Sequence, residues 1–375
     1  PYFLQQLDHH STYPVNARVI RQHAELDERG SRWTRAENFV GNGPFTLKEW
    51  LPNQRLIVEK NPNYWEANKV ILNEIHYLPI DDKLTEERMY RTGQIHMTMD
   101  GRILTEKIAY YQEKKPEHIS IAPYLGTYYY EFNTTIKPFD NKQVRRALSM
   151  AIDKQLICSS LVKGGQLPAY SFTPPGTAGY SPNIKMPFDP LAAKALLAEA
   201  GYPNGNGFPS AELIFNTSEN HRKVALAIQQ MWKKHLGIDI TLINQEWKVY
   251  LDNRDNKNYA IARAGWLGDY LDPNTFLEIF LSDSGNNRTG WSNSEYDTLI
   301  NRANSTLDTN VRYDFFQQAE AILIDSAPIA PIYIESSVRL IHPTVKGVYT
   351  NNLAYYPFRH VYLESANDML SIQEN

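Results

Sequence analysis

The sequence predicts an α/β fold with more than one domain, and three observations lead to this prediction. The chain has 375 residues, whereas single hydrophobic cores rarely extend beyond about 300 residues. Between residues 124 and 340, stretches typical of helices alternate with stretches typical of strands, which is the pattern of an α/β domain. Hydrophobic residues make up 42% of the chain and charged residues only 21%, so sizeable cores can form.

Composition and charge argue against several classes of protein. A net charge of −4, from 38 Lys and Arg against 42 Asp and Glu, gives no overall basic field, so we do not expect a nucleic-acid partner. No apolar run approaches the roughly 18 residues of a membrane-spanning helix. The one cysteine, Cys158, has no partner for an intramolecular disulfide, and we interpret it as a buried structural thiol rather than a nucleophile.

The first third of the chain favours a sheet. A turn signal, Asn-Gly-Pro at 42–44, precedes a strand at 45–50, and Pro-Asn-Gln at 52–54 separates that strand from another at 55–60, which predicts a hairpin. Alternating apolar residues over 70–78 predict a further strand. The shorter elements expected around this sheet are helices at 19–28 and 85–92 and strands at 95–98, 345–349 and 359–363.

The middle of the chain predicts two strands and then a long helix. The strands, at 119–124 and 128–133, are separated by Gly126. Asp140 or Asn141 is suited to cap the helix, which we expect to run to about Val162.

The remaining segments alternate between helix and strand. Asp189-Pro190 begins a helix that ends near Gly201, the arrangement of proline first and glycine last that helices prefer. A strand at 213–215, a helix at 221–236 ended by Gly237 and a strand at 238–244 predict a βαβ unit. The later elements are a strand at 258–266 and helices at 295–303 and 310–325.

Motifs for catalysis and for metal binding are not found in the sequence. There is no HExxH pair, no phosphate-binding glycine loop of either common type and no GxSxG nucleophile elbow. His9 and His10 are adjacent, and on an extended segment their side chains would point to opposite faces. We therefore expect no metal, no cofactor and no enzymatic activity.

One segment suggests ligand capture. Directly after a predicted strand, residues 263–270 read Arg-Ala-Gly-Trp-Leu-Gly-Asp-Tyr, which places Gly265, Trp266 and Asp269 within a few residues. A carboxylate at a strand end can pair with an ammonium group, and exposed strand backbone can hydrogen-bond a peptide laid beside it. The alternative is a Gly-Asp turn with Trp266 in the core, and these residues alone do not decide between the two.

Several blocks spread over the chain add a family resemblance. The blocks are Asn42-Gly43-Pro44-Phe45-Thr46-Leu47 with Trp50, Asn61-Pro62-Asn63-Tyr64-Trp65, Tyr128-Tyr129-Tyr130-Glu131, Pro138-Phe139-Asp140-Asn141, Val144-Arg145-Arg146-Ala147, Ala151-Ile152-Asp153-Lys154, Pro168-Ala169-Tyr170, Pro174-Pro175, Asn244-Gln245-Glu246-Trp247 and Arg263-Ala264-Gly265-Trp266. Together they resemble the periplasmic oligopeptide-binding proteins of ABC importers, in family 5 of the extracellular solute-binding proteins.

The resemblance implies a periplasmic-binding-protein-like fold with two lobes, mixed sheets flanked by helices and a ligand cleft between the lobes. We expect residues 16–123 plus 341–375 to form an incomplete main lobe and residues 124–340 to form the second α/β lobe. Residues 1–15 would be a remnant of an N-terminal portion that the family has and this chain lacks.

The resemblance also implies a set of ligand-binding residues. The position of Asp269 pairs with the amino terminus of the peptide, and backbone around Gly265 and Leu267 pairs with the peptide strand. The full set is Asp269, Gly265, Trp266, Leu267, Arg263, Arg254, Trp247, His221, Glu131 and Tyr129.

Other members of that set have more than one interpretation. Arg254, Arg263 and His221 match positions that neutralise peptide carboxyl termini, while Trp247 and Glu131 match walls of side-chain pockets. Arg263 could instead be held in an internal ion pair, and His221 could simply begin a helix. Tyr128 and Tyr130, which share one strand face, could be core residues.

The implied function is an extracytoplasmic receptor that captures short peptides and delivers them to an ABC importer. Its partners would be short peptides and the permease and ATPase subunits of the importer. The chain would be a monomer in the periplasm, either alone or associated with the lacking N-terminal portion. The sequence begins Pro1-Tyr2-Phe3 without a leader, so any signal peptide has been removed or was never present. The alternatives are a receptor for murein tripeptide, haem or another small ligand, and, in another class, a peptidase.

Overall fold

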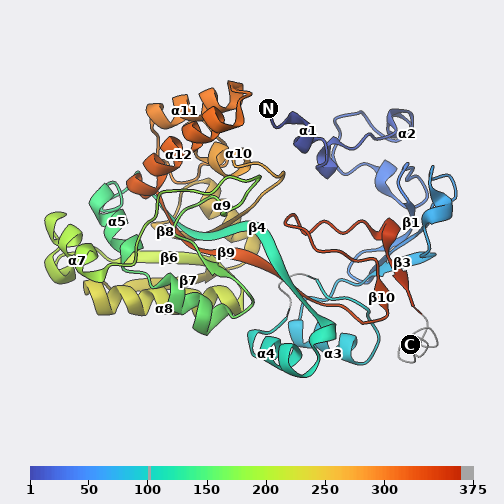
Figure 1. Cartoon of the computed structure of the whole chain (residues 1–375), viewed down its shortest axis with the longest axis horizontal. Coiled ribbons are helices and arrows are strands. Elements are labelled where there is room, and N and C mark those ends of the chain that lie inside the picture. Colours follow the sequence, from blue (N-terminus) through green and yellow to red (C-terminus); the bar gives the residue numbers. More distant parts are fainter. Residues whose placement is uncertain (100–102, 365–375) are drawn as a thin grey trace. The chain divides into compact units, whose positions relative to one another are not determined.

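A computed structural model of the chain describes residues 1–99 and 103–364 (Figure 1). It divides into two compact units, of which unit 1 comprises Pro1–His9 and Pro123–Ser336, and unit 2 comprises His10–Ala122 and Ser337–Asn375. Two long strands, β4 (Ile119–Phe132) and β9 (Ile329–Leu340), each begin in one unit and end in the other.

The expected lobe boundaries can be set beside this division. We expected one boundary after residue 123, and the second segment of unit 1 begins at Pro123. We expected the other boundary after residue 340, and this segment ends at Ser336. The segment 1–15, expected to be separate, is divided between the two units after His9.

Unit 1 is built on a six-stranded mixed sheet. Its order is β5-β9-β4-β8-β6-β7, where β5 is Leu167–Pro168, β8 is Ile261–Leu267, β6 is Ala211–Asn216 and β7 is Ile240–Gln245. β6 is parallel to both β7 and β8, whereas β4 and β8 are antiparallel. A mixed sheet flanked by helices confirms the predicted α/β class.

The helices of unit 1 begin and end where local chemistry favours it. α7 (Pro190–Glu199) has the proline at its start and the Asp189 carboxylate accepting a hydrogen bond from Ala192 N at 3.0 Å. α8 (Glu219–Leu236) ends at Gly237, whose φ is +72°. A Cβ there would lie 2.3 Å from Asn204 O, so only glycine fits.

Further helices of unit 1 cover the two sides of the sheet (Figure 1). They are α5 (Lys142–Met150), α6 (Lys154–Leu156), α9 (Trp247–Asp255), α10 (Asn274–Leu277), α11 (Ser294–Ser305) and α12 (Thr309–Ser326). Unit 1 also includes the short helix α1 (Phe3–Gln6). The structure thus confirms the predicted helices at 221–236, 295–303 and 310–325.

Two predictions for the middle of the chain are wrong. The strands expected on either side of Gly126 are one strand, β4, because Gly126 stays in the ladder opposite Leu267. The single helix expected to extend to Val162 is interrupted at 151–153, where Asp153 is extended and caps α6 by accepting from Leu156 N. A π-helix, Ile157–Val162, continues from α6.

Unit 2 contains the predicted hairpin and third strand as an antiparallel sheet. Its strands are β1 (Phe45–Leu51), β2 (Arg55–Lys60) and β3 (Glu74–Tyr77), in that order, which leaves β3 at an edge. Its other elements are α2 (Ala17–Arg21), α3 (Lys83–Arg91), α4 (Thr105–Lys114) and the paired short strands β10 (Val345–Lys346) and β11 (Tyr362–Leu363).

Two expectations in unit 2 need correction. The helix expected over 19–28 begins earlier and is shorter, since α2 spans only the 5 residues Ala17–Arg21. The stretch 95–98 forms no strand and makes a single bridge from Met97 to Ile341. Thr98 N donates to Leu340 O at 3.0 Å, but Leu340 N donates to the Thr98 hydroxyl instead of to a backbone carbonyl, so the ladder does not continue. Tyr90, Tyr111 and Leu340 belong to the apolar cluster beside it.

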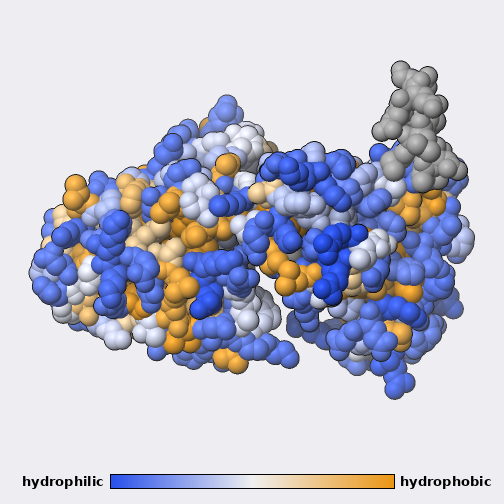
Figure 2. Space-filling model, turned by 90° about the horizontal axis from the view of Figure 1, so that it is seen from below, coloured by the Kyte–Doolittle hydropathy of each residue, from blue (hydrophilic) through white to orange (hydrophobic). Residues whose placement is uncertain are grey.

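On the face drawn in Figure 2, hydrophobic residues are scattered among hydrophilic ones. Isolated exposed apolar side chains of this kind are normal for folded proteins. Among the described residues, the structure contains no helix whose length and hydropathy would suit a membrane span.

Candidate functional site

The pairing of β4 with β8 decides which side of the sheet each predicted residue faces. Gly126 lies opposite Leu267, Tyr128 opposite Gly265 and Tyr130 opposite Arg263. Because side chains alternate along a strand, one side of the sheet carries Tyr128, Tyr130, Arg263 and Leu267, together with Tyr333 and Glu335 of β9. We call this side the Arg263 face. The opposite side, the Glu131 face, carries Tyr129, Glu131, Ala264 and Trp266.

On the Arg263 face, a guanidinium lies over a stack of aromatic rings. The Arg263 guanidinium carbon is 4.7 Å from the centre of the Tyr128 ring, which stacks on Tyr333 with a centroid separation of 4.6 Å. Burial raises the pKa of Tyr128. The Nε atom of Arg263 is buried and has no hydrogen-bond partner among the described residues. An unpaired buried donor is rare in folded proteins, which marks this guanidinium as a candidate for contact with a ligand.

His221 approaches the same ring from helix α8. Its Nδ1 lies 3.3 Å from the Tyr128 hydroxyl, and the two rings are 5.5 Å apart. His221 lies in the first turn of its helix, as the alternative interpretation of this residue expected. Tyr128 and Tyr130 are fully buried, as expected for core residues. The fold nevertheless brings His221 and Arg263 together on one tyrosine.

The second half of β8 is open along one backbone edge within the part of the chain that the structure describes. β6 pairs with β8 only at Ile261 and Ala262. Beyond them Gly265 is exposed and Leu267 is 45% exposed. This half of the strand therefore has β4 on one side and no strand on the other.

The hydrogen bonds at the two ends of the ladder show which residues face the open edge. Asn133 N donates to Ala260 O at 3.0 Å, and Gly268 N donates to Leu125 O at 2.7 Å. Bonding alternates along an antiparallel pair, so residues with even numbers in this stretch bond to β4. Those with odd numbers, Gly265 and Leu267 among them, direct N–H and C=O away from β4, where an extended chain could pair with them.

Asp269 lies just beyond the end of β8 and is held by its backbone. Its N–H donates to Thr275 Oγ1 at 3.1 Å, while its side chain is 54% exposed and lies 3.9 Å from His9 Nε2. Gly268 precedes it, and a Cβ there would lie 2.6 Å from Leu125 Cδ2. Close packing of Gly268 thus fixes where the Asp269 carboxylate leaves the sheet.

Arg254 and Glu131 lie on the Glu131 face and pair with each other. Arg254 Nη2 is 2.5 Å from Glu131 Oε1 and Nε is 3.2 Å from Oε2, with Glu131 1% exposed and Arg254 8% exposed. The Tyr259 hydroxyl donates to the same carboxylate at 3.3 Å. Binding roles for this pair stay predictions; its geometry is that of a buried brace between β4 and α9.

The other predicted residues are placed as follows. Tyr129 is buried against the rings of Phe172 and Phe280. Trp266 is half-buried on the Glu131 face, and its Nε1 has no partner among the described residues. Trp247, at the start of α9, is 49% exposed and stacks on Tyr250.

Glu335 is a residue of the Arg263 face that the sequence analysis did not single out. It is half-buried, and its Cγ lies 3.2 Å from the position that a Cβ on Gly126 would take. Burial raises its pKa to about 7, against the opposing effect of Arg263. The sequence offered one signal for it: Glu335 is the one acidic residue in the stretch 329–340, which is largely buried in the structure.

Cys158 lies near Glu335 and behaves as a structural thiol. It is buried, and burial together with the Glu335 carboxylate raises its pKa to about 12. A thiol with that pKa is protonated at neutral pH and is a poor nucleophile. Among residues 1–99 and 103–364, no group of three or more His, Cys, Asp or Glu side chains could hold a metal ion.

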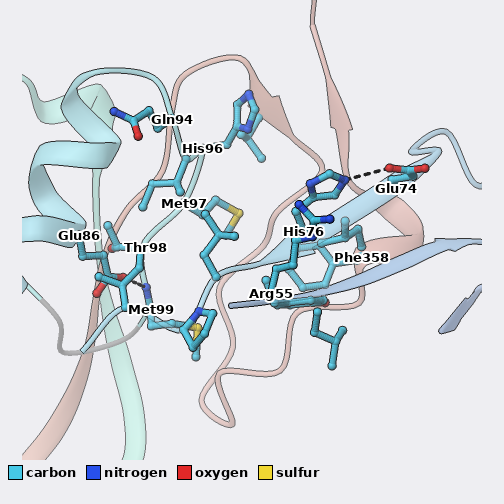
Figure 3. A pocket seen from close by; sticks show the side chains of 18 of the residues that line it. Arg55, Glu74, His76, Glu86, Gln94, His96, Met97, Thr98, Met99 and Phe358 are labelled. Atoms are coloured by element: carbon cyan, nitrogen blue, oxygen red, sulfur yellow. Dashed lines mark hydrogen bonds and ion pairs between the residues drawn. The ribbon is translucent and has the colours of Figure 1, made fainter. Parts of the chain in front are cut away.

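Unit 2 contains a cavity of about 740 Å³ that none of the predicted site residues lines (Figure 3). The free edge of β3 borders it, and the segment 94–99 borders it as well. The Glu86 carboxylate accepts a hydrogen bond from Met99 N at 2.8 Å, and His76 pairs with Glu74 at 2.9 Å. Most of the lining is apolar, whereas the Arg263 face carries charged and polar side chains, so we take the Arg263 face as the candidate site.

Comparison with known proteins identifies a family. The model of the bacterial extracellular solute-binding proteins, family 5 (middle), matches residues 1–288. The periplasmic oligopeptide-binding protein of Salmonella typhimurium is 37% identical over 354 residues, which cover 92% of this chain and 64% of the relative. The periplasmic murein peptide-binding protein of Escherichia coli is 39% identical over 361 residues, which cover 94% and 65%. The chain thus spans less than two thirds of the length of these relatives.

Solved structures agree with the sequence comparison. The structure of the Escherichia coli murein tripeptide binding protein has a TM-score of 0.86 and 36% identity, covering 97% of this chain and 71% of that one. The Haemophilus influenzae oligopeptide-binding protein in complex with the peptide RPPGFSPFR has a TM-score of 0.83 and 34% identity, with the same coverage. These comparisons confirm the family resemblance and the periplasmic-binding-protein fold, while the expected cleft stays a prediction.

Proposed function

Because the chain belongs to the bacterial extracellular solute-binding proteins, family 5, we propose that it captures short peptides along the open edge of β8. This proposal depends on one observation. The N–H and C=O groups of Gly265 and Leu267 face away from β4, and two side chains of opposite charge, Asp269 and Arg263, lie on either side of them along the chain. A peptide is an extended chain with a cation at one end and an anion at the other, and it can add to such an edge as a strand.

The spacing of the charges suits a short peptide. Arg263 and Leu267 are four residues apart, or about 13 Å along a strand, and Asp269 follows two residues later. The Arg263 guanidinium reaches back over Gly265, since its Nη2 is 3.3 Å from the position of a Cβ there. Three or four extended residues fill that distance, so the site would take tripeptides and somewhat longer peptides.

Backbone recognition supports broad acceptance of peptide sequences. Hydrogen bonds to the peptide backbone and its termini give affinity without selecting side chains, and waters can adapt to the rest. The closing of two lobes would then link capture to recognition by a membrane ABC importer. On this proposal the chain acts in the periplasm as a monomeric receptor and leaves its ligand chemically unchanged.

A partner segment for unit 2 belongs to the same proposal. The edge of β3 borders the apolar cavity, and the relatives are longer than this chain. We propose that an extended segment from the additional length found in the relatives pairs with β3 and covers Met97 and Met99 (Figure 3).

The test is native mass spectrometry of the purified chain, followed by calorimetry with trialanine. A ladder of co-purifying short peptides is the expected result, whereas one defined ligand would favour the murein-peptide or small-ligand alternative. Incubation with a labelled tripeptide should leave it intact. Turnover that disappears when Arg263 is replaced would favour the peptidase alternative instead.

A further inference from the structure

One backbone oxygen on the open edge of β8 already has a partner. Arg263 has an odd number, so its C=O is directed away from β4, like those of Gly265 and Leu267. The Tyr250 hydroxyl of α9 donates a hydrogen bond to this oxygen. An added strand would need the same oxygen to continue its ladder beyond Gly265. The edge is therefore open at Leu267 and Gly265 and occupied at Arg263.

Local structure at the start of α9 places Tyr250. The Glu246 carboxylate caps the helix by accepting hydrogen bonds from Lys248 N at 2.8 Å and Val249 N at 3.4 Å. Tyr250 N then donates to Glu246 O at 2.9 Å, which closes the first turn. Because residues three apart in a helix are neighbours, Trp247 lies beside Tyr250, and their rings stack with centroids 5.8 Å apart. The first turn of α9 thus presents both aromatic rings on one side.

The Tyr250 ring is held from several sides. It is fully buried and belongs to an apolar cluster with Ile214, Tyr259 and Ala262. The Arg254 guanidinium carbon lies 5.6 Å from the centre of the ring. Burial raises the pKa of Tyr250 to about 12, so its hydroxyl is protonated and able to donate at neutral pH. Packing and hydrogen bonding together hold the hydroxyl at the edge of β8.

A peptide placed as in the proposed function would reach this hydroxyl. With its amino end at Asp269 and its carboxyl end towards Arg263, the peptide runs antiparallel to β8. An antiparallel pair forms its hydrogen bonds at every second residue, so a peptide can pair first with Leu267 and then with Gly265. The next pairing position is Arg263, whose oxygen is bonded to Tyr250. Beyond it, β6 pairs with the first two residues of β8, so the edge is not open there either.

We propose that Tyr250 is a specificity-determining residue that limits how much of a peptide can pair with β8. The inference rests on the proposed function and narrows its ligand class to peptides of about three or four residues. Two pairing positions with one residue between them span three residues, and a fourth can follow without pairing. Residues beyond the fourth gain no backbone hydrogen bond from β8, so added length brings no added affinity.

The first measurement uses the unmodified chain and compares alanine peptides of three to six residues by calorimetry. The affinity should not increase from tetraalanine to hexaalanine, whereas a further backbone hydrogen bond would raise it by about threefold or more. A gain of that size overturns the inference alone, because the peptides still bind. Failure of the chain to bind any of them overturns the proposed function and the inference together.

The second measurement removes the donor. Tyr250→Phe keeps the ring and frees Arg263 O, so hexaalanine should gain at least about threefold in affinity relative to tetraalanine. The matched control is Tyr296→Phe, because Tyr296 is also fully buried and its hydroxyl donates to a backbone oxygen, that of Leu277, at 2.6 Å. The control should keep the ratio of the unmodified chain.

The two variants separate length selection from a structural role. A purely structural hydroxyl would change the affinities for all lengths equally and leave the ratio unchanged in Tyr250→Phe, and this result overturns the inference. Replacing the amide N–H groups of the fifth and sixth residues of hexaalanine by ester oxygens should cancel the gain in Tyr250→Phe, since these groups supply the donor for Arg263 O. A gain that survives the esters would contradict the assignment.

Discussion

Arg254 of α9 and Glu131 of β4 are 123 residues apart in sequence and form an ion pair inside unit 1. Two hydrogen bonds join the side chains, and the Tyr259 hydroxyl adds a third bond to the carboxylate. The pair removes both charges from the reach of solvent. It thereby fixes α9 against the sheet that carries the candidate site.

Removing one partner of this pair should destabilise the chain strongly. Arg254→Ala leaves the Glu131 carboxylate buried and unpaired, which typically costs about 3–5 kcal/mol of unfolding free energy. Urea denaturation followed by circular dichroism measures the change. Lys223→Ala, which breaks the exposed pair with Glu219 on α8, is the control and should cost less than about 1 kcal/mol. Equal effects of the two substitutions would contradict a structural role for the pair.

Asp269→Ala should weaken the binding of peptides with a free amino end. Calorimetry with trialanine and its acetylated form should show a loss of at least about tenfold for the free peptide, since a charge partner is lost, and little change for the acetylated one. Asp283→Ala, an exposed acid of the same unit, serves as the control. Equal losses for both peptides would refute the assignment of Asp269.

Arg263→Gln should act on the other end of the peptide. Its guanidinium carries the positive charge of the Arg263 face, so peptides with a free carboxyl end should lose at least about tenfold in affinity. Peptides amidated at that end should bind almost as before. Arg222→Gln, exposed on α8, is the matched control. A uniform loss for free and amidated peptides would point to misfolding of the face rather than to recognition of the carboxylate.

Lys154→Met should stabilise unit 1 at neutral pH. The Lys154 amine is fully buried, 3.5 Å from Met186 O, and burial lowers its pKa to about 7. The unfolded chain keeps an ordinary lysine pKa near 10.4, so between pH 7 and about 10 the unfolded state binds more protons and stability rises with pH. Lys154→Met should remove this slope and gain about 2–4 kcal/mol at pH 7.

Urea denaturation at pH 7 and at pH 9.5 checks this prediction, with Lys234→Met, an exposed lysine of α8, as the control. The advantage of Lys154→Met should shrink at the higher pH. An advantage that is the same at both values would mean that packing, not the charge, explains it.

Much of the local structure could be predicted because its causes are local. The cap at Asp189, the proline that follows it and the glycine at 237 act through neighbours within a few residues, so sequence reasoning located α7 and α8. Gly126 misled it, since glycine commonly breaks a strand. Here Leu267, 141 positions later, fills the space beside that glycine and keeps β4 continuous.

The site was predicted as a set of residues without its geometry. The resemblance put Arg263, Gly265, Leu267 and Asp269 in one set, and the structure places them along one strand and its end. It also separates Glu131 and Arg254 from them, on the opposite side of the sheet. Glu335 could not be chosen from sequence, because its burial and its distance from Arg263 depend on which strand lies beside β4.

The sequence by itself determined the α/β class, most helix and strand positions and the family, since these follow from side-chain periodicity, turn and cap residues and short motifs. Only the tertiary structure decided which side of the sheet each charge occupies, which charges cancel and which stay available. The physical reason is that the register between strands distant in sequence sets side-chain direction, burial and pairing at once. A one-residue change in that register would exchange the two faces.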